Sequence, residues 1–475
     1  YNYIPTYTGP GHASIYTGAT PQTHGIISNN WFNKFKNKKV YCVADPNVTP
    51  IGTSSAAGKM SPHRMITTTV ADQNRLHTQM RGKTIGVALK DRGSILPAGH
   101  AANAAYWFHG ADEGHWISSS YYMDELPGWV KEFNASKKAE SYLKEWNTLY
   151  NIDSYTESGN DLNNFEGGFD GKKKAVFPYK LKALMKENGG FSILKSTPYG
   201  NSLTTDFAIA AIENEELGQD QYTDFLTVSF SSTDYVGHNF GVNSKEVEDT
   251  YLRLDQDLAR LLNALNKKVG KGNYTLFLTA DHGAVQVPAY LASVNIPAGY
   301  FDAGEFSDNL REFVTQEFGV DGLIRNISNS QVFLNYNTIK ENEISAEELQ
   351  NAIARFALNQ NQVYKVFTRE QLEATTYSAD IPYLLDNGFN QKRSGDVVWV
   401  LKPGVLASHS KTGTSHGSGQ NYDTHVPLIF YGNGINKGST LQRTEIVDIA
   451  PTISALLGIS FPNGATGNPI ETVIN

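Results

Sequence analysis

Carboxylates and imidazoles follow apolar, β-prone runs at several places in this sequence. Residues 274–284 read YTLFLTADHGA, and the apolar run stops at Asp281 and His282. Such a run is typical of a strand buried on both faces of a parallel sheet. Ligands of open α/β sheets bind beyond the carboxyl ends of the strands. A carboxylate beside an imidazole is a zinc ligand pair, although an Asp-His-Gly after a strand is often a turn with a satisfied histidine.

Two further stretches end in the same way. Residues 224–230 form another buried-strand run, and Asp234 and His238 follow it four residues apart. A third histidine, His416, precedes the apolar run 426–431. Beyond a strand end, Asp234 and His238 can fold back onto one ion. Three separate stretches therefore favour a metal site, and the imidazoles favour zinc over magnesium, which prefers oxygen ligands.

One amphipathic helix is expected to connect two of these stretches. Across residues 243–267, apolar side chains recur at alternating steps of four and three, and Gly270 closes the pattern. As the crossover between the strands that end near Asp234 and Asp281, this helix predicts a right-handed βαβ unit. Both strand ends would then meet at one edge of the sheet.

The N-terminal stretch predicts a loop that opens a short helix, with Pro10 in its first turn and Gly18 as its stop. Thr8 would lie just before this helix, where free N–H groups and the positive dipole end favour a bound phosphate and an ionised hydroxyl. An ordinary N-cap explains Thr8 equally simply. Asn29 can donate to a phosphoryl oxygen, or it can be a turn residue.

A pair of cations follows the predicted strand 84–89. Lys90 and Arg92 are two residues apart, so on an extended segment they point the same way and can converge on one anion. A solvated strand end would show the same spacing.

These residues together resemble the alkaline phosphatase superfamily, in the threonine branch that holds the nucleotide pyrophosphatase/phosphodiesterases and the phosphate-irrepressible alkaline phosphatases. The motifs that carry the resemblance are Thr8-Gly9-Pro10-Gly11-His12, Thr17-Gly18, Pro21, His24-Gly25-Ile26-Ile27, Asn29, Asp234 with His238, Asp281-His282, His416-Gly417 and residues 445–453. The resemblance implies that Thr8 is the nucleophile and that Asn29 contacts the phosphoryl group.

The resemblance also implies two zinc ions. Asp234, His238 and His416 would hold one, while Asp281, His282 and Thr8 would hold the other with a further aspartate from the end of an earlier strand. No residue before Tyr1 is available to supply that aspartate. Either the strand that carries it lies in an omitted N-terminal segment, or the site is incomplete and weak.

Residues 89–102, which include Lys90 and Arg92, are similar to the phosphate-irrepressible alkaline phosphatases in particular. There the lysine and arginine bind the non-transferred phosphate oxygens, and the diesterases lack the pair. The resemblance thus implies hydrolysis of small-molecule phosphate monoesters through a phosphothreonine at Thr8, with inorganic phosphate as product and inhibitor, in a periplasmic or extracellular protein. A phosphodiesterase of the same fold and a non-catalytic metal- or phosphate-binding protein are the alternatives. Arylsulfatases need Cys or Ser, and phosphoglycerate mutases Ser, where Thr8 stands.

Composition excludes several classes of partner. The chain has 475 residues and a formal net charge of −8, with a pI near 5.9, so it has no general attraction to nucleic acid or anionic membranes. No apolar run approaches the ~20 residues that span a bilayer. The single cysteine, Cys42, excludes an internal disulfide and is expected to be a small buried hydrophobe.

The expected architecture is one α/β domain over residues 1–475, with a mostly parallel central sheet sandwiched by helices. A rim insertion is expected at residues 107–203 and a cap lobe at 289–394. Residues 397–401 are expected to resume the core sheet.

Overall fold

The central sheet is mixed. In the computed structural model, which describes residues 1–111 and 113–474, five strands lie in the order β3-β6-β5-β4-β9. Neighbours β5, β4 and β9 are parallel, whereas β6 and β3 are antiparallel to their neighbours. The strands span Pro50–Ile51 (β3), Thr84–Ala88 (β4), Ala104–His109 (β5), His115–Ser119 (β6) and Phe225–Ser229 (β9). The predicted α/β class is therefore confirmed.

Alternate side chains of the central strands enter two separate cores. Tyr106 and Phe108 pack in one cluster with Phe207 of α8 (Pro198–Asn214). Trp107, between them, packs on the other face with Ile95 of α4 (Asp91–Ala98). This alternation follows from the two-residue period of a strand. Both faces are consequently buried under helices, which fixes the sheet and the positions of its strand ends.

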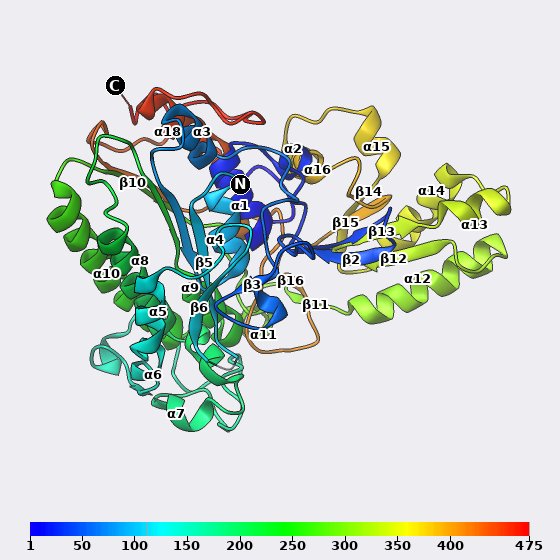
Figure 1. The fold of residues 1–475 in the computed structure, drawn as a ribbon. Helices are drawn as coiled ribbons and strands as arrows, with labels where there is room; N and C mark the ends of the chain where they lie inside the picture. Colours follow the sequence, from blue (N-terminus) through cyan, green and yellow to red (C-terminus); the bar gives the residue numbers. More distant parts are fainter. Residues whose placement is uncertain (112, 475) are drawn as a thin grey trace.

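The helix expected at 243–267 is present as α10 (Lys245–Leu265), followed by a π-helical turn (Asn266–Gly270). Ser244 caps it by accepting a hydrogen bond from the Val247 N–H group at 3.2 Å. Helix α10 packs against α8 on one side of the central sheet (Figure 1). It lies between β9 and β10 (Thr275–Thr279) in the chain, as predicted. The expected βαβ unit is not formed, because β10 is not in the sheet of β9.

The setting of β10 differs from the prediction. Strand β10 runs antiparallel to β17 (Leu428–Gly432), whereas β9 pairs with β4, and every residue of β10 is only partly buried. The expectation of a strand buried on both faces of a parallel sheet is therefore wrong for residues 274–284. A five-residue apolar run predicts a strand but does not select its partner.

Residues 289–401 build a lobe with a sheet of its own (Figure 1). Its strands lie in the order β12-β13-β15-β14, and α12 and α14 pack over it around Trp399 and Phe306. Residues 397–401 were expected in the core sheet, but as β15 they pair with strands of this lobe on both sides. An apolar run has the same sequence pattern in either sheet, so the sequence alone did not assign residues 397–401 to one of them. The bounds are Ala303–Phe318 (α12), Ile324–Ser328 (β12), Gln331–Leu334 (β13), Ala346–Leu358 (α14), Val363–Thr368 (β14) and Val397–Leu401 (β15).

The predicted rim insertion starts too early. Residues 107–119 belong to β5 and β6 of the central sheet, and only the segment that follows forms short helices and loops at one end of the molecule (Figure 1). Those helices are α5 (Gly128–Ala135), α6 (Lys138–Ser141) and α7 (Leu181–Leu184). In the described part of the chain, no helix is long and apolar enough to cross a membrane.

Candidate active site

Thr8 is the first residue of α1 (Thr8–Thr17), and its side chain is buried. The sequence placed it one residue earlier, as a possible N-cap. That role is taken by Tyr7, whose side chain makes no capping hydrogen bond. The predicted stop is confirmed, because Gly18 adopts the left-handed conformation (φ 64°) that closes the helix. The Thr8 hydroxyl is therefore not used to cap the helix.

Few N–H groups are free at the start of α1. The Gly9 N–H group donates to Asn29 Oδ1 at 2.7 Å, Pro10 has none, and the Gly11 N–H group bonds to the carbonyl of Tyr7 at 2.8 Å. Gly9, Pro10 and Gly11 therefore offer no free N–H group to a phosphate. The bond from Gly9 orients the Asn29 amide, so that its oxygen is occupied and its NH₂ group remains to donate.

His12, which the sequence did not single out as a site residue, connects Thr8 to the predicted metal ligands. Its Nδ1 lies 2.9 Å from the Thr8 carbonyl oxygen and 3.4 Å from Asp281 Oδ2. Its Nε2 lies 2.9 Å from the hydroxyl of Ser229, the last residue of β9. His12 therefore joins α1, the end of β9 and the stretch after β10.

Gly11 allows α1 to approach Asp281. A Cβ atom at Gly11 would lie 2.4 Å from the carbonyl oxygen of Asp281 and 2.9 Å from its Cβ. Overpacking of this kind costs about 1–3 kcal/mol. We expect Gly11→Ala to push Thr8 away from Asp281 and to lower kcat/KM at least tenfold, measured with a chromogenic phosphate ester. Gly128→Ala, where a Cβ meets nothing within 4 Å, is the matched control, and an equal effect of both changes would contradict this explanation.

Asp234, His238 and His416 converge. Asp234 Oδ1 lies 3.2 Å from His238 Nε2 and 3.5 Å from His416 Nε2, and the candidate ligand atoms of all three lie within 4.8 Å of one another. Asp234 and His238 were expected to fold back onto one ion beyond the strand end, and the sequence did not predict a helix there. Instead both lie on α9 (Ser232–Phe240), where a four-residue spacing puts them on one face.

The histidine tautomers leave Nε2 free to bind a metal. Nδ1 of His238 lies 2.8 Å from the carbonyl of Thr414, and Nδ1 of His416 lies 2.7 Å from the carbonyl of Thr6. Nδ1 of His282 likewise lies 2.9 Å from the carbonyl of the residue that follows it. Because a carbonyl only accepts, each Nδ1 carries the proton. This second contact is the usual arrangement of metal-ligating histidines.

Asp281 and His282 lie beside this group. His282 Nε2 is 3.3 Å from Asp281 Oδ2 and 4.0 Å from Asp234 Oδ1. The His282 ring stacks on that of His416, with centroids 3.4 Å apart. His282 is buried, and apart from its approach to Asp281 Oδ2 its Nε2 has no hydrogen-bond partner among the described residues. A buried nitrogen that lacks a partner is costly, and a metal ion would satisfy it.

The charges of the site suit a cation. Burial alone would raise the pKa of Asp234, but Lys90 and then His238 hold that pKa well below its ordinary value. Burial also opposes ionisation of Asp281, yet His282 and His12 lower its pKa. Burial lowers the pKa of His416 well below its ordinary value. The group thus offers ionised carboxylates and, at His416, a neutral imidazole, which are protonation states that bind metals. Burial opposes the charged form of His282 as well, but Asp281 raises its pKa.

Lys90 and Arg92 are placed differently from the prediction. A helix, α4, begins at Asp91, so the two side chains do not share an extended segment. Lys90 Nζ forms an ion pair with Asp234 Oδ2 and lies 4.7 Å from the centre of the Tyr235 ring. Lys90 therefore belongs to the cluster around Asp234, whereas Arg92 contacts a different residue, Tyr41.

Arg92 is held by Tyr41. The guanidinium NH1 donates to the Tyr41 hydroxyl at 3.0 Å, and that hydroxyl donates to Asp91 Oδ1. Arg92 Nε is buried without a hydrogen-bond partner among the described residues. Arg92 is thus fixed on one side and keeps a donor for a ligand. Tyr41 and Asp91 were missed because their roles depend on a contact between segments distant in sequence.

We expect Tyr41→Phe to loosen Arg92. A typical hydrogen bond contributes about 0.5–1.5 kcal/mol, so kcat/KM should fall roughly 3- to 10-fold. In an Arg92→Ala background the same change should have almost no further effect. Steady-state rates of the two single variants and the double variant form the cycle, and independent effects of the two changes would contradict the contact's role.

The chain matches a family model and several known proteins. The model for type I phosphodiesterase/nucleotide pyrophosphatase matches residues 1–426. A Myroides odoratus protein named calcium-transporting ATPase is 45% identical over 100% of this chain and 87% of its own. Alkaline phosphatase PafA of Elizabethkingia meningoseptica is 43% identical over 100% of this chain and 86% of its own. Alkaline phosphatase PhoV of Synechococcus elongatus is 44% identical over 99% and 85%.

The fold agrees with that of a solved relative. The crystal structure of wild-type PafA superimposes with a TM-score of 0.96 at 43% identity, covering 100% of this chain and 91% of that one. The family match, the identities and this superposition extend over the stretches that carry Thr8, Asp234, Asp281 and His416. The chain therefore belongs to the type I phosphodiesterase/nucleotide pyrophosphatase family of the alkaline phosphatase superfamily, in the branch that includes the alkaline phosphatases PafA and PhoV.

Proposed function

We propose that the protein is an alkaline phosphatase that hydrolyses phosphate monoesters through a phosphothreonine formed at Thr8 in a site with two zinc ions. The observation that carries the proposal is the convergence of Asp234, His238, His416, Asp281 and His282 beside the helix that Thr8 begins. The high identity to alkaline phosphatases PafA and PhoV supports monoester hydrolysis.

The donor set fits zinc. Nitrogen and carboxylate ligands suit this ion, and the unpartnered His282 Nε2 is explained by it. Asp234, His238 and His416 would hold one ion, whereas Asp281, His282 and the Thr8 hydroxyl would contribute to the other. When bound, such ions lower the proton affinity of a hydroxyl and stabilise a leaving oxygen.

The side chains of the chain itself then have distinct tasks. The Thr8 oxygen attacks phosphorus in line, a bond forms between them, and the bond from phosphorus to the alcohol oxygen breaks. The departing alcohol oxygen takes up a proton from solvent. Water then attacks the phosphorus of the phosphothreonine, the bond from phosphorus to the Thr8 oxygen breaks, and inorganic phosphate leaves while the Thr8 oxygen regains a proton. The NH₂ group of Asn29, Lys90 and Arg92 would donate to the three oxygens that do not react, where a loose phosphoryl transition state carries its charge.

Lys90 can contact Asp234 and the substrate's phosphoryl group at the same time. An ammonium group has three donors, and one is used by Asp234 Oδ2. The remaining donors are available to a phosphoryl oxygen. Lys90 would thus stabilise the ionised state of Asp234 while it attracts the substrate's charge.

Two cations near the phosphoryl group favour monoesters over diesters. A monoester dianion has three unsubstituted oxygens to share among Asn29, Lys90 and Arg92, whereas a diester has two and one fewer charge. The terminal phosphoryl group of ATP also has three, so the proposed site would release phosphate from ATP too. That reaction is compatible with the name of the Myroides odoratus relative.

The family likeness supports two more expectations. Free inorganic phosphate, the product, should compete with substrate because the same donors bind it. A periplasmic or extracellular location is proposed from the resemblance to phosphate-irrepressible alkaline phosphatases.

The proposed reaction is tested by comparing kcat/KM for p-nitrophenyl phosphate and bis-p-nitrophenyl phosphate on zinc-loaded protein. We expect the monoester to react much faster. Rates on the diester that equal or exceed those on the monoester would favour a phosphodiesterase. Zinc-loaded protein without turnover of either ester would indicate a binding protein.

A further inference from the structure

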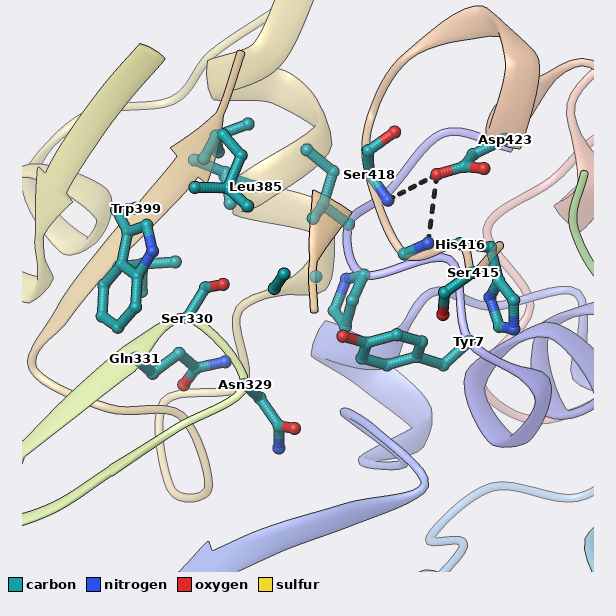
Figure 2. Close-up of a pocket in the computed structure, with 18 of the residues that line it drawn as sticks. Tyr7, Asn329, Ser330, Gln331, Leu385, Trp399, Ser415, His416, Ser418 and Asp423 are labelled. Carbon is teal, nitrogen blue, oxygen red and sulfur yellow. Dashed lines mark hydrogen bonds between the residues drawn. The ribbon is translucent and has the colours of Figure 1, made fainter. Parts of the chain in front are cut away.

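Asp423 contacts the loop that carries His416. It lies in the short helix α17 (Asn421–Thr424) and is 1% exposed. Its Oδ2 accepts hydrogen bonds from the N–H groups of Gly417 at 3.0 Å and Ser418 at 2.7 Å, and Figure 2 shows both. These are the two residues directly after His416, so the bonds fix the direction in which the chain leaves this histidine.

The main chain of Asp423 contacts the other candidate ligand loop. Its carbonyl oxygen accepts a hydrogen bond from the N–H group of Gly283, the residue after His282, at 2.8 Å. The two segments touch so closely that a Cβ at Gly283 would lie 2.0 Å from the carbonyl oxygen of Tyr422. One residue therefore holds both loops, with its side chain on the His416 loop and its backbone on the His282 loop.

The His416 loop borders a cavity on the side of the 289–401 lobe. This cavity of about 140 Å³ is lined by Gly417, Ser418 and Tyr7 on one side and by Trp399 and Ser330 of the lobe on the other (Figure 2). Gly417 has no side chain to anchor, and its φ of +125° is a conformation that most residues avoid. Thr6 holds the same loop as well, because its carbonyl accepts from His416 Nδ1 at 2.7 Å and its hydroxyl donates to the Ser418 carbonyl at 2.9 Å. The bonds from the Gly417 and Ser418 N–H groups to Asp423 add the contact on the side of α17.

We propose that Asp423 is a positioning residue for the metal centre, which holds His416 through the Gly417 and Ser418 N–H groups and sets its place relative to His282. This inference rests on the proposed two-zinc function. Changes to groups that orient a metal ligand typically lower metal affinity about 10- to 100-fold. Because only the side chain is altered by substitution, the ion held by Asp234, His238 and His416 should be affected first.

The test follows zinc release from the loaded protein to a chromogenic chelator. We expect Asp423→Ala to release one ion at least about tenfold faster than the unaltered protein, with the second ion leaving at nearly the original rate. Asp423→Asn should restore slow release, since its amide oxygen accepts both N–H groups. Its NH₂ group would replace Oδ1, which has no hydrogen-bond partner among the described residues. Asn421→Ala, an exposed change on the same short helix, is the matched control.

Several results would overturn the inference. Unchanged release from Asp423→Ala would do so, as would equally fast release from Asp423→Asn, because a residue that acts through these hydrogen bonds is rescued by an acceptor. If Asp423→Ala does not fold, amide hydrogen exchange of the unaltered protein decides. Slow exchange at Gly417 and Ser418 supports the role of Asp423, and fast exchange contradicts it. Unaltered protein that binds no zinc would instead contradict the proposed function itself.

Discussion

Replacement of Thr8 by alanine should abolish turnover of phosphate monoesters while zinc remains bound. The Thr8 hydroxyl would be the nucleophile, and Thr8 is the first residue of α1, so no other hydroxyl of this helix stands at the same position. Loss of a catalytic nucleophile lowers kcat by roughly 10⁴–10⁶. The measurements are kcat with p-nitrophenyl phosphate, zinc content by elemental analysis, and phosphate retained on acid-quenched protein by mass spectrometry.

Thr8→Ser is the matched control, because it keeps a hydroxyl at the same position. It should keep a measurable phosphoenzyme and most of the activity. Full activity of Thr8→Ala with the same zinc content would defeat the nucleophile assignment. Loss of zinc from Thr8→Ala would show instead that this side chain is needed mainly to hold the metal.

The double change Lys90→Ala with Arg92→Ala should reduce monoesterase activity far more than diesterase activity. Hydrogen bonds from charged groups contribute about 1.5–3 kcal/mol each, so the loss of both should lower monoester kcat/KM by roughly 10²–10⁴. A diester has fewer charged oxygens for Lys90 and Arg92 to contact, so its hydrolysis should lose less when both are removed. The ratio of kcat/KM for one monoester to that for one diester reports the difference.

The chain provides a control pair with the same spacing. Arg81 and Lys83 precede β4, whereas Lys90 and Arg92 follow it. The two pairs therefore lie at opposite ends of the same strand. Arg81→Ala with Lys83→Ala should leave the ratio unchanged. Zinc content must be compared as well, since Lys90 pairs with Asp234. Equal losses on both esters, at full zinc occupancy, would remove the reason for choosing monoesters.

Part of the candidate site could be predicted because its residues follow strand ends. Asp281 and His282 come one residue after the end of β10, and Asp234 follows β9. A strand that is specified by an apolar run brings the residue after it to the edge of the sheet, whichever strand it pairs with. The apolar runs did not show that the two ends meet, because β10 pairs with β17 and not with β9. His12, which contacts both Ser229 and Asp281, joins them.

The rest depends on contacts that sequence spacing does not encode. The run at 397–401 is a strand in either sheet, and only its partners place β15 in the 289–401 lobe. The side chain of Arg92 was expected to point the same way as that of Lys90. However, α4 begins between the two residues, and Tyr41, which is distant in sequence, holds the Arg92 guanidinium. His12 likewise contacts the side chains of Ser229 and Asp281 from other segments. Asp423 accepts hydrogen bonds from the N–H groups of Gly417, Ser418 and Gly283.

The most direct test of the account combines a metal count with activity during stepwise removal of metal. Protein loaded with zinc and freed of excess ion should contain two zinc ions per chain. In the unaltered protein, monoesterase activity should fall as a chelator removes the zinc ions and should return when zinc is added back. Adding zinc should restore no activity to a variant with Asp234, His238 and His416 all changed to alanine. Full activity of protein that holds no zinc, or zinc binding unaffected by the loss of those three side chains, would contradict it.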